Sequence, residues 1–263
     1  MFPDVLLYLI LALLAIGGLL WFMCAPSSKG KRASFLVGAK VAHRGLHDKS
    51  IKENTFPGFV AAAEHHYGVE LDVHLSSDGV PVISHDPTLT RVFGIERAVS
   101  SLTREELADI GVPTLAEVLQ VLDKEKPLVV EIKGENGDTT VCQKTAEVLD
   151  GYDGCYCIES FNPLYVRWFK KHRPDVVRGQ LSTHFGRDCG KPFPLRFLLK
   201  NLFTNMLGRP HFIAYEHRYG STAALRFCRL LGAVTVAWTV KTKEEEIASS
   251  PYFSGIIFES YRP

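Results

Sequence analysis

The sequence has little that would mark a disulfide-stapled domain, a zinc ribbon or a nucleic-acid-binding protein. Its six cysteines are scattered over 263 residues with no CxxC pair, so reduced thiols are expected. The 30 Lys and Arg residues are balanced by 29 Asp and Glu, without an arginine-rich arm, and we therefore expect no nucleic-acid partner. With 46% hydrophobic and 22% charged residues, the composition is that of a globular protein with a large core.

The longest hydrophobic run lies near the N-terminus, where residues 5–24 contain no charged side chain. A helix of this length spans about 30 Å, the thickness of the hydrocarbon core of a bilayer. A cleaved signal peptide would need a positive segment and a shorter apolar run, whereas only Asp4 is charged before this one. The bulky residues 21–23 argue against a lipoprotein cleavage site at Cys24. We therefore predict a transmembrane anchor over residues 1–24.

Cations follow this run but do not precede it. Lys29, Lys31 and Arg32 lie within eight residues of its end, and the first four side chains carry no positive charge. By the positive-inside rule, this asymmetry predicts a single-pass protein of the cell membrane with the domain after residue 36 in the cytoplasm. The small, polar and basic residues 25–36 predict a tether whose lysines also contact anionic lipid headgroups.

From residue 37 onward, short β-branched runs alternate with helical stretches, a pattern typical of βα units and a parallel sheet. Eight runs are largely hydrophobic and most end in a polar or charged residue, as expected for parallel strands buried on both faces. They cover residues 37–43, 69–75, 127–133, 155–160, 176–182, 211–217, 233–240 and 255–260. This count predicts an α/β fold of the TIM (β/α)8 barrel type. An open, doubly wound sheet is the alternative that strand counting leaves open.

Two parts of this pattern are irregular for a barrel. Residues 76–113 form a long insertion between the second strand and its helix, and no helix follows the last strand before Pro263. The barrel domain, expected over residues 37–263, would then close in an atypical way. We expect a homodimer or the membrane surface to cover the position of the missing helix.

Charged residues stand at the ends of the predicted strands, where a barrel carries its active site. Glu70 and Asp72 are two residues apart, so both point to the barrel interior, and Glu131 and Lys133 follow the same rule. Carboxylates that converge in a water-poor mouth are costly unless they bind a cation. The sequence therefore predicts a Mg²⁺ or Ca²⁺ site of Glu70, Asp72 and Glu131. A buried ion-pair network of Glu70 and Glu131 with Arg44 and Lys133 is the alternative, and the two are not exclusive.

His43 and His85 flank this carboxylate cluster in the predicted barrel. Imidazole titrates near neutral pH, so one ring can deprotonate a nucleophile while the other protonates a departing alkoxide. Asp86 precedes Pro87, and we interpret it as a cap of the following turn rather than as a partner of His85. The other histidines of this region are interpreted as surface or filler residues: His47, His65, His66 and His74.

Residues 42–94 closely resemble the glycerophosphodiester phosphodiesterase family, and weaker similarity continues to about residue 260. The matching motifs stand in the family's order and spacing: His43-Arg44-Gly45, Glu53-Asn54-Thr55, Glu70-Leu71-Asp72-Val73, Asp78-Gly79, His85-Asp86, Pro113-Thr114-Leu115 and Glu131-Ile132-Lys133. One such motif alone would be weak, but this many ordered matches do not arise by chance.

The resemblance implies a TIM barrel with a small insertion around residues 76–113. It also implies metal-dependent hydrolysis of glycerophosphodiesters to glycerol 3-phosphate and an alcohol. By position in the family, His43 and His85 would form the acid–base pair, and Glu70, Asp72 and Glu131 would bind one divalent cation. Arg44 and Lys133 would contact the phosphate, and Trp238 would form the aromatic wall for glycerol. Glu53 and Asn54 would organise the first loop.

Two positions depart from the family. Lys241 stands where many relatives carry asparagine, and Glu259 where they commonly carry aspartate. Both lie at strand ends, so the sequence does not decide which alcohol headgroup the substrate carries. The nucleophile, either water or the 2-hydroxyl of the substrate, is open as well.

Residues 194–207 carry Leu, Phe and Met at helical spacing. An ordinary barrel helix buried on one face explains this pattern. The alternative is an interfacial helix on lipid, which would favour a lysophospholipid over a water-soluble small-molecule diester. A phospholipase-C-like enzyme and an inactive membrane-tethered binding module are further alternatives. The complete set of histidines and carboxylates argues against inactivity.

Overall fold

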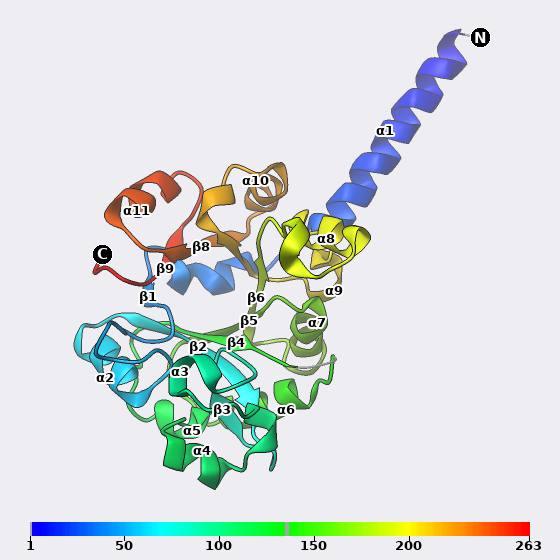
Figure 1. Cartoon of the computed structure of the whole chain (residues 1–263). Helices are drawn as coiled ribbons and strands as arrows, with labels where there is room; N and C mark the ends of the chain where they lie inside the picture. The colour runs from blue at the N-terminus through cyan, green and yellow to red at the C-terminus, as the bar shows by residue number, and fades with distance from the viewer. Residues whose placement is uncertain (1, 135–136) are drawn as a thin grey trace.

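The structure is a computed structural model that describes residues 2–134 and 137–263. It consists of a barrel domain and one long helix, α1 (Phe2–Cys24), which projects away from the barrel (Figure 1). Met1, the first residue of the predicted anchor, lies outside the described residues.

Eight parallel strands close into a barrel, because β1 pairs with β9 on one side and with β2 on the other. They are β1 (Lys40–Ala42), β2 (Gly68–Leu75), β4 (Leu128–Ile132), β5 (Tyr156–Ser160), β6 (Val177–Ser182), β7 (Phe212–Glu216), β8 (Val234–Val240) and β9 (Gly255–Phe258). Each overlaps one of the eight predicted runs. The TIM-barrel prediction is confirmed, and an open doubly wound sheet is excluded.

Alternating side chains along the strands build two layers of core. In β4, Val129 packs inside the barrel with Val41 and Phe212, whereas Val130 packs outside, between the strands and the helices. Glu131 takes the same side as Val129, since successive residues of a strand point to opposite faces. Its carboxylate therefore lies above an apolar floor inside the barrel.

Helices cover the outside of the barrel between the strands (Figure 1). They are α2 (Phe56–Glu64), α5 (Leu115–Val118), α6 (Thr140–Leu149), α7 (Pro163–His172), α8 (Phe193–Lys200), α9 (Asn205–Gly208), α10 (Ala223–Leu230) and α11 (Lys243–Ser249), with the short 3₁₀ helices η3 (Arg187–Cys189) and η4 (His217–Tyr219). In the described part of the chain no helix follows β9, where Tyr67 and Tyr261 pack against Phe258. Because the β1–β9 ladder closes the barrel regularly, the expected atypical closure is wrong.

The insertion after β2 begins with a strand that the sequence pattern did not predict. β3 (Pro81–Ile83) runs antiparallel to β2 and is followed by α3 (Thr90–Phe93), η2 (Val99–Ser101) and α4 (Arg104–Ile110). These elements enclose a small core of their own, formed by Val82, Leu89, Val99, Leu102, Leu107 and Val112. Ser84 N–H donates a 3.0 Å hydrogen bond to the Asp72 carbonyl, which returns the chain to the barrel mouth just before His85.

Part of the segment predicted as a tether packs onto the barrel instead. Residues 30–36 form the 3₁₀ helix η1 (Gly30–Leu36), in which Ala33 and Leu36 are fully buried in the internal core with Phe212. A Cβ added at Gly255 would lie only 2.2 Å from the Leu36 carbonyl oxygen, so η1 approaches β9 as closely as backbones allow. With Phe35 packed against the same cluster, these side chains complete the core at the N-terminal end of the barrel.

The end of α1 is fixed to the barrel by hydrogen bonds. Asn205 Nδ2 donates to the Cys24 carbonyl at 2.9 Å, and Arg209 Nη1 donates to the Ala25 carbonyl at 2.9 Å. The Arg209 guanidinium also lies over the Phe22 ring, 4.9 Å from its centroid. Beyond this junction, α1 contains a stretch of mean hydropathy 2.6 that is not buried by the barrel. By length and composition it fits a membrane anchor or a signal sequence.

Candidate active site

The loop after β1 turns sharply at the barrel mouth. His43 N–H donates to the Phe258 carbonyl at 2.9 Å, which extends the β1–β9 pairing by one residue. Arg44 and Gly45 then take positive φ values of 56° and 79°, a conformation that glycine adopts without strain. As a result the Arg44 N–H points into the barrel and donates to Glu70 Oε2 at 2.9 Å.

Three buried carboxylates meet at this mouth. Glu70 and Asp72 lie on β2, and Asp72 is the direct cross-strand neighbour of Glu131 on β4. One oxygen of each lies within 4.8 Å of the others. A set of buried oxygen donors with negative charge is what Mg²⁺ and Ca²⁺ bind in proteins. The structure thus brings together the three residues predicted as metal ligands.

Burial disfavours the charged form of two of these three carboxylates. Burial raises the pKa of Glu70 well above its usual value, and Asp72 and Glu131 raise it further. Burial likewise raises the pKa of Glu131 to about 7. The pKa of Asp72 is lowered, because Lys133 and neighbouring cations outweigh the effect of its burial. The cluster fits a divalent cation, since the charge of such an ion would let all three carboxylates ionise.

The ion-pair network left open by the sequence is present as well. Lys133 Nζ lies 2.7 Å from Glu131 Oε1 and 3.1 Å from Asp72 Oδ1, and Arg44 Nε lies 3.4 Å from Asp72 Oδ2. Two cations do not balance three carboxylates, so this pairing is compatible with a bound metal. Lys133 is held among the carboxylates and does not line the cavity described below.

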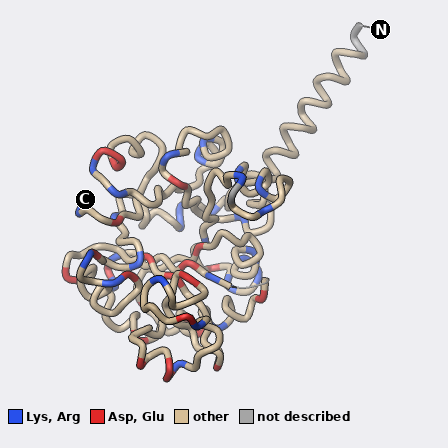
Figure 2. Tube along the Cα trace, viewed as in Figure 1, with Lys and Arg blue, Asp and Glu red and all other residues tan. Residues whose placement is uncertain are grey.

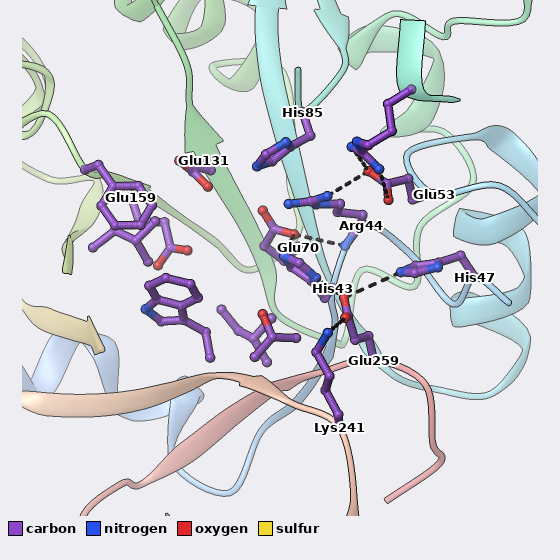
Figure 3. Close-up of a pocket in the computed structure, with 16 residues that line it drawn as sticks. His43, Arg44, His47, Glu53, Glu70, His85, Glu131, Glu159, Lys241 and Glu259 are labelled. Atoms are coloured by element: carbon purple, nitrogen blue, oxygen red, sulfur yellow. Dashed lines mark hydrogen bonds and ion pairs between the residues drawn. The ribbon is translucent and has the colours of Figure 1, made fainter. Parts of the chain in front are cut away.

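His43 and His85 lie on either side of Glu70 (Figure 3). Each ring has its Nδ1 bound by a carboxylate: His43 Nδ1 lies 2.6 Å from Glu259 Oε2, and His85 Nδ1 lies 2.7 Å from Asp86 Oδ1. Nε2 is therefore the nitrogen left for proton transfer, and that of His43 lies 4.0 Å from Glu70 Oε2. Both predicted proton carriers occur at one mouth.

Asp86 orients His85, so its interpretation as a mere turn cap is wrong. Its second oxygen, Oδ2, accepts a 2.6 Å hydrogen bond from Arg91 Nε. Burial lowers the pKa of His85, and the charge of Lys133 lowers it further, against the pull of Asp72 and Asp86. The sequence offered the signal in the adjacency of a histidine and a carboxylate, but adjacency alone does not tell which way the carboxylate turns.

Glu53 and Asn54 hold the first loop against the rest of the site. Glu53 Oε1 accepts 2.7 Å hydrogen bonds from Arg44 Nη1 and from Arg91 Nη2, and so links this loop to α3 of the insertion. Burial alone would raise the pKa of Glu53, but the hydrogen bonds from the two arginines lower it to about 2. Asn54, at a φ of 54°, donates from Nδ2 to Asp72 Oδ2 at 2.8 Å.

A cavity of about 400 Å³ opens onto these groups. Part of its wall is apolar, where the rings of Phe161 and Trp238 meet edge to face with centroids 5.5 Å apart. The buried Trp238 Nε1 has no hydrogen-bond partner among the described residues. The wall therefore offers aromatic faces and one N–H donor to a ligand.

Sequence reasoning did not assign to the site several side chains that line this cavity, among them Glu159, Glu259 and His47. Glu159 is the cross-strand neighbour of Glu131 at the end of β5, and Glu259 follows β9, so the rule of charged strand ends could have found both. His47, interpreted as a filler, lies with its Nε2 3.9 Å from Glu259 Oε2. Its sequence neighbours carry no signal that marks it.

A family model described as the glycerophosphoryl diester phosphodiesterase family matches residues 43–249. The chain belongs to this family. It is accordingly an enzyme, a phosphoric diester hydrolase that acts on glycerophosphodiesters. The matched region begins at His43 and includes His85 and the three buried carboxylates, whereas Glu259 lies beyond its end.

Named relatives resemble the chain over most of its length. A glycerophosphodiester phosphodiesterase of Caldanaerobacter subterraneus subsp. tengcongensis is 30% identical over 224 residues, covering 78% of this chain and 86% of that protein. Glycerophosphodiester phosphodiesterase 1 of Homo sapiens is 26% identical over 261 residues, covering 84% and 76% respectively.

Solved structures share the fold. A glycerophosphodiester phosphodiesterase from Thermotoga maritima superposes with a TM-score of 0.69 at 25% identity and covers 84% of this chain and 94% of its own. A phosphodiesterase of Oleispira antarctica, solved in complex with the product sn-glycerol-3-phosphate, gives a TM-score of 0.71 at 22% identity and covers 88% and 95%. These likenesses extend over most of the chain.

Proposed function

We propose that the chain hydrolyses glycerophosphodiesters to glycerol 3-phosphate and an alcohol with one divalent cation, Mg²⁺ or Ca²⁺, on Glu70, Asp72 and Glu131. The observation that carries this proposal is the meeting of three buried carboxylates with two histidines at one barrel mouth. When bound, the cation would supply Lewis-acid polarisation of the phosphoryl group.

Arg44 binds the phosphate from beside the carboxylates. Its guanidinium is held by Glu53 and Asp72 and lines the cavity, where it offers N–H groups to the nonbridging phosphate oxygens. Negative charge grows on these oxygens in the transition state, so a positioned cation stabilises it. Lys133, the other phosphate contact implied by the family, first balances the charge of Asp72 and Glu131.

His43 and His85 carry the proton transfers. One ring accepts a proton at Nε2 from the attacking hydroxyl, and the other donates a proton to the oxygen of the departing alcohol. Glu259 and Asp86 bind Nδ1 of the two rings and so keep Nε2 turned toward the substrate. Water and the 2-hydroxyl of the glycerol moiety both suit this arrangement as nucleophile. Trp238 gives the glycerol an aromatic face.

Membrane anchoring through α1, with the barrel in the cytoplasm, is part of the proposal. It is supported by the apolar stretch Val5–Cys24 and by the Lys and Arg residues gathered where α1 joins the barrel (Figure 2). The hydrogen bonds from Asn205 and Arg209 to the carbonyls of Cys24 and Ala25 argue against cleavage as a signal sequence. Cleavage at this junction would disrupt them.

The exposure of α8 favours a second candidate substrate, a lysophospholipid taken from the bilayer. Phe193, Leu195 and Phe197 are 68%, 38% and 46% exposed, unlike the buried stripe of an ordinary barrel helix. The end of α8 adjoins the end of α1, because Cys24 Sγ lies 3.6 Å from the Asn201 carbonyl oxygen. An apolar helix face beside a membrane anchor is suited to contact with lipid.

Phosphorus NMR of the products tests these proposals together. The full chain, purified in detergent, is assayed on glycerophosphocholine, glycerophosphoethanolamine and a lysophospholipid, with EDTA and with added Mg²⁺ or Ca²⁺. Metal-dependent release of glycerol 3-phosphate from the water-soluble diesters supports the first candidate. Turnover of the lysophospholipid alone favours the second, and a cyclic phosphate indicates attack by the 2-hydroxyl.

Substitution of the histidines tests their role in the same assay. His43→Ala and His85→Ala should each lower turnover by at least about 10²-fold, the scale of general acid–base catalysis. Near-normal activity of either purified variant would refute that role. No turnover by the wild-type chain with any metal would instead favour a binding module without catalysis.

A further inference from the structure

Beside the three carboxylates, the described residues form a second donor set of different chemistry. One ligand atom from each of His43, His47 and Glu259 lies within 4.8 Å of the others. His43 Nδ1 lies 2.6 Å and His47 Nε2 3.9 Å from the same oxygen, Glu259 Oε2. Two imidazoles and one carboxylate are donors that zinc takes in open sites, whereas Mg²⁺ and Ca²⁺ prefer oxygen alone.

The surroundings leave these donor atoms available to a metal. His47 Nε2 is buried and has no hydrogen-bond partner among the residues that the structure describes. Lys241 Nζ holds Glu259 through the other oxygen, Oε1, at 2.7 Å, so Oε2 is turned toward both histidines (Figure 3).

The distances are close to those of a tetrahedral zinc site. Bonds of about 2.0–2.2 Å to nitrogen and oxygen place neighbouring ligand atoms roughly 3.3 Å apart. On zinc binding, the distance from His43 Nδ1 to Glu259 Oε2 would lengthen by less than about 1 Å. The distance from His47 Nε2 to the same oxygen would shorten by a similar amount. Side-chain rotation alone covers such changes.

We propose that His43, His47 and Glu259 bind Zn²⁺ and that this binding inhibits the enzyme. Zinc on Nδ1 of His43 keeps the ring proton on Nε2, which leaves the ring no lone pair with which to accept a proton. That Nε2 lies 4.0 Å from Glu70 Oε2, on the side of the ring away from the proposed zinc. The inhibition rests on the proposed role of His43 in proton transfer, but the zinc site itself does not.

Lys241 opposes zinc at this site. Its ammonium pairs with Glu259 and repels a second cation nearby, and its side chain is 56% exposed, so it can turn to solvent. Removal of its charge should therefore tighten zinc binding, whereas removal of the His47 imidazole should weaken it. These opposite effects distinguish this site from zinc bound at the three carboxylates.

The test measures zinc binding and turnover separately. The full chain in detergent, with saturating Mg²⁺ or Ca²⁺ to fill the carboxylate cluster, is titrated with Zn²⁺ by calorimetry and with Co²⁺ by visible absorption. We expect one tight site with a four-coordinate Co²⁺ spectrum. His47→Gln should weaken zinc binding at least about tenfold, and Lys241→Gln should strengthen it. His66→Gln, at an exposed histidine outside the site, is the matched control.

Turnover of glycerophosphocholine then tests inhibition. Zinc should inhibit the wild-type chain, and His47→Gln should need at least about tenfold more zinc to lose the same fraction of its own zinc-free turnover. Unchanged zinc affinity in His47→Gln would overturn the site, and zinc binding that leaves turnover unchanged or raises it would overturn the inhibition. If the wild-type chain turns over no diester, the proposed function fails, while the calorimetry and the Co²⁺ spectrum still decide the site.

Discussion

Asp86 determines which nitrogen His85 presents to the cavity. Its Oδ1 binds His85 Nδ1 and its Oδ2 is fixed by Arg91. Asp86→Asn keeps the size of the side chain but removes its charge and one acceptor, so the ring loses its preferred tautomer. We expect kcat to fall about tenfold or more with little change in KM, measured by steady-state kinetics on glycerophosphocholine.

A double variant separates positioning from a direct role of Asp86. If Asp86 acts only through His85, His85→Ala combined with Asp86→Asn should be no slower than His85→Ala alone. Losses that multiply in the double variant would contradict this positioning role.

Glu53 should make the stability of the protein depend on pH in acid. The two arginines hold its pKa at about 2 in the folded protein, against an unfolded value near 4.3. The lowered pKa stabilises the fold above the unfolded value, and this contribution is lost as the pH falls toward 2. The Tm advantage of the wild type over Glu53→Gln should therefore shrink between about pH 6 and pH 3. A constant advantage across this range would contradict the prediction.

For single residues, the sequence predicted the directions of strand side chains better than those of loop side chains. Spacing of two along a strand predicted that Glu70 and Asp72 share a face, because the strand period is fixed. The turn of Asp86 toward His85 depends on Arg91, which arrives from the insertion. The approach of His47 to Glu259 depends on the positive φ of Arg44, and no pattern in the sequence reports it.

The 3₁₀ helix η1 should contribute to stability as a part of the barrel. Leu36 is fully buried in the internal core, whereas the next residue, Val37, is 59% exposed. Leu36→Ala should lower the free energy of unfolding by about 2–5 kcal/mol through the lost burial and the cavity. Val37→Ala, the matched control, should change it by less than about 0.5 kcal/mol. Urea denaturation followed by circular dichroism measures both, and equal effects would contradict the packing of η1.

Elements with a clear hydrophobic period were predicted, and short elements defined by tertiary contacts were not. All eight barrel strands fall within the runs that the sequence pattern predicted. β3 has only three residues and exists because it pairs with β2, and η1 carries Lys31 and Arg32 among small polar residues. The basic residues suggested a tether, although Ala33 and Leu36 enter the core.

The carboxylate cluster should bind its cation more tightly as the pH rises. Burial holds the pKa of Glu131 at about 7 in the absence of metal, and a bound cation requires the ionised form. Affinity for Mg²⁺ or Ca²⁺ should therefore increase from about pH 6 to pH 8, with protons released on binding. Calorimetry in buffers of different ionisation enthalpy measures both, and a pH-independent affinity would contradict the assignment.

Contact of α8 with a bilayer should matter for lipid substrates alone. Phe193→Ser combined with Phe197→Ser, at two exposed positions, removes apolar area from the proposed lipid-facing surface. We expect slower turnover of a lysophospholipid in vesicles and unchanged turnover of glycerophosphocholine. Leu230→Ser, at a residue of α10 that is 85% exposed, is the control for a general loss of exposed apolar area. Equal loss on both substrates would argue for a structural effect.

For the molecule as a whole, the sequence predicted the barrel, the family and a membrane-length helix, but not how the helix meets the barrel. That junction depends on Asn205, Arg209 and Cys228, which are remote in the sequence from Cys24. Long-range contacts of this kind leave no local period to detect.

The fixed junction of α1 also sets how the enzyme can move. Because the carbonyls of Cys24 and Ala25 are bonded to the barrel, there is no free hinge between the membrane-length helix and the catalytic mouth. In a bilayer the mouth would keep a constant height above the lipid and would spin only about the axis of α1. Encounters with a lipid substrate would then be two-dimensional and governed by lateral diffusion in the membrane plane, whereas a water-soluble diester would still arrive from solution.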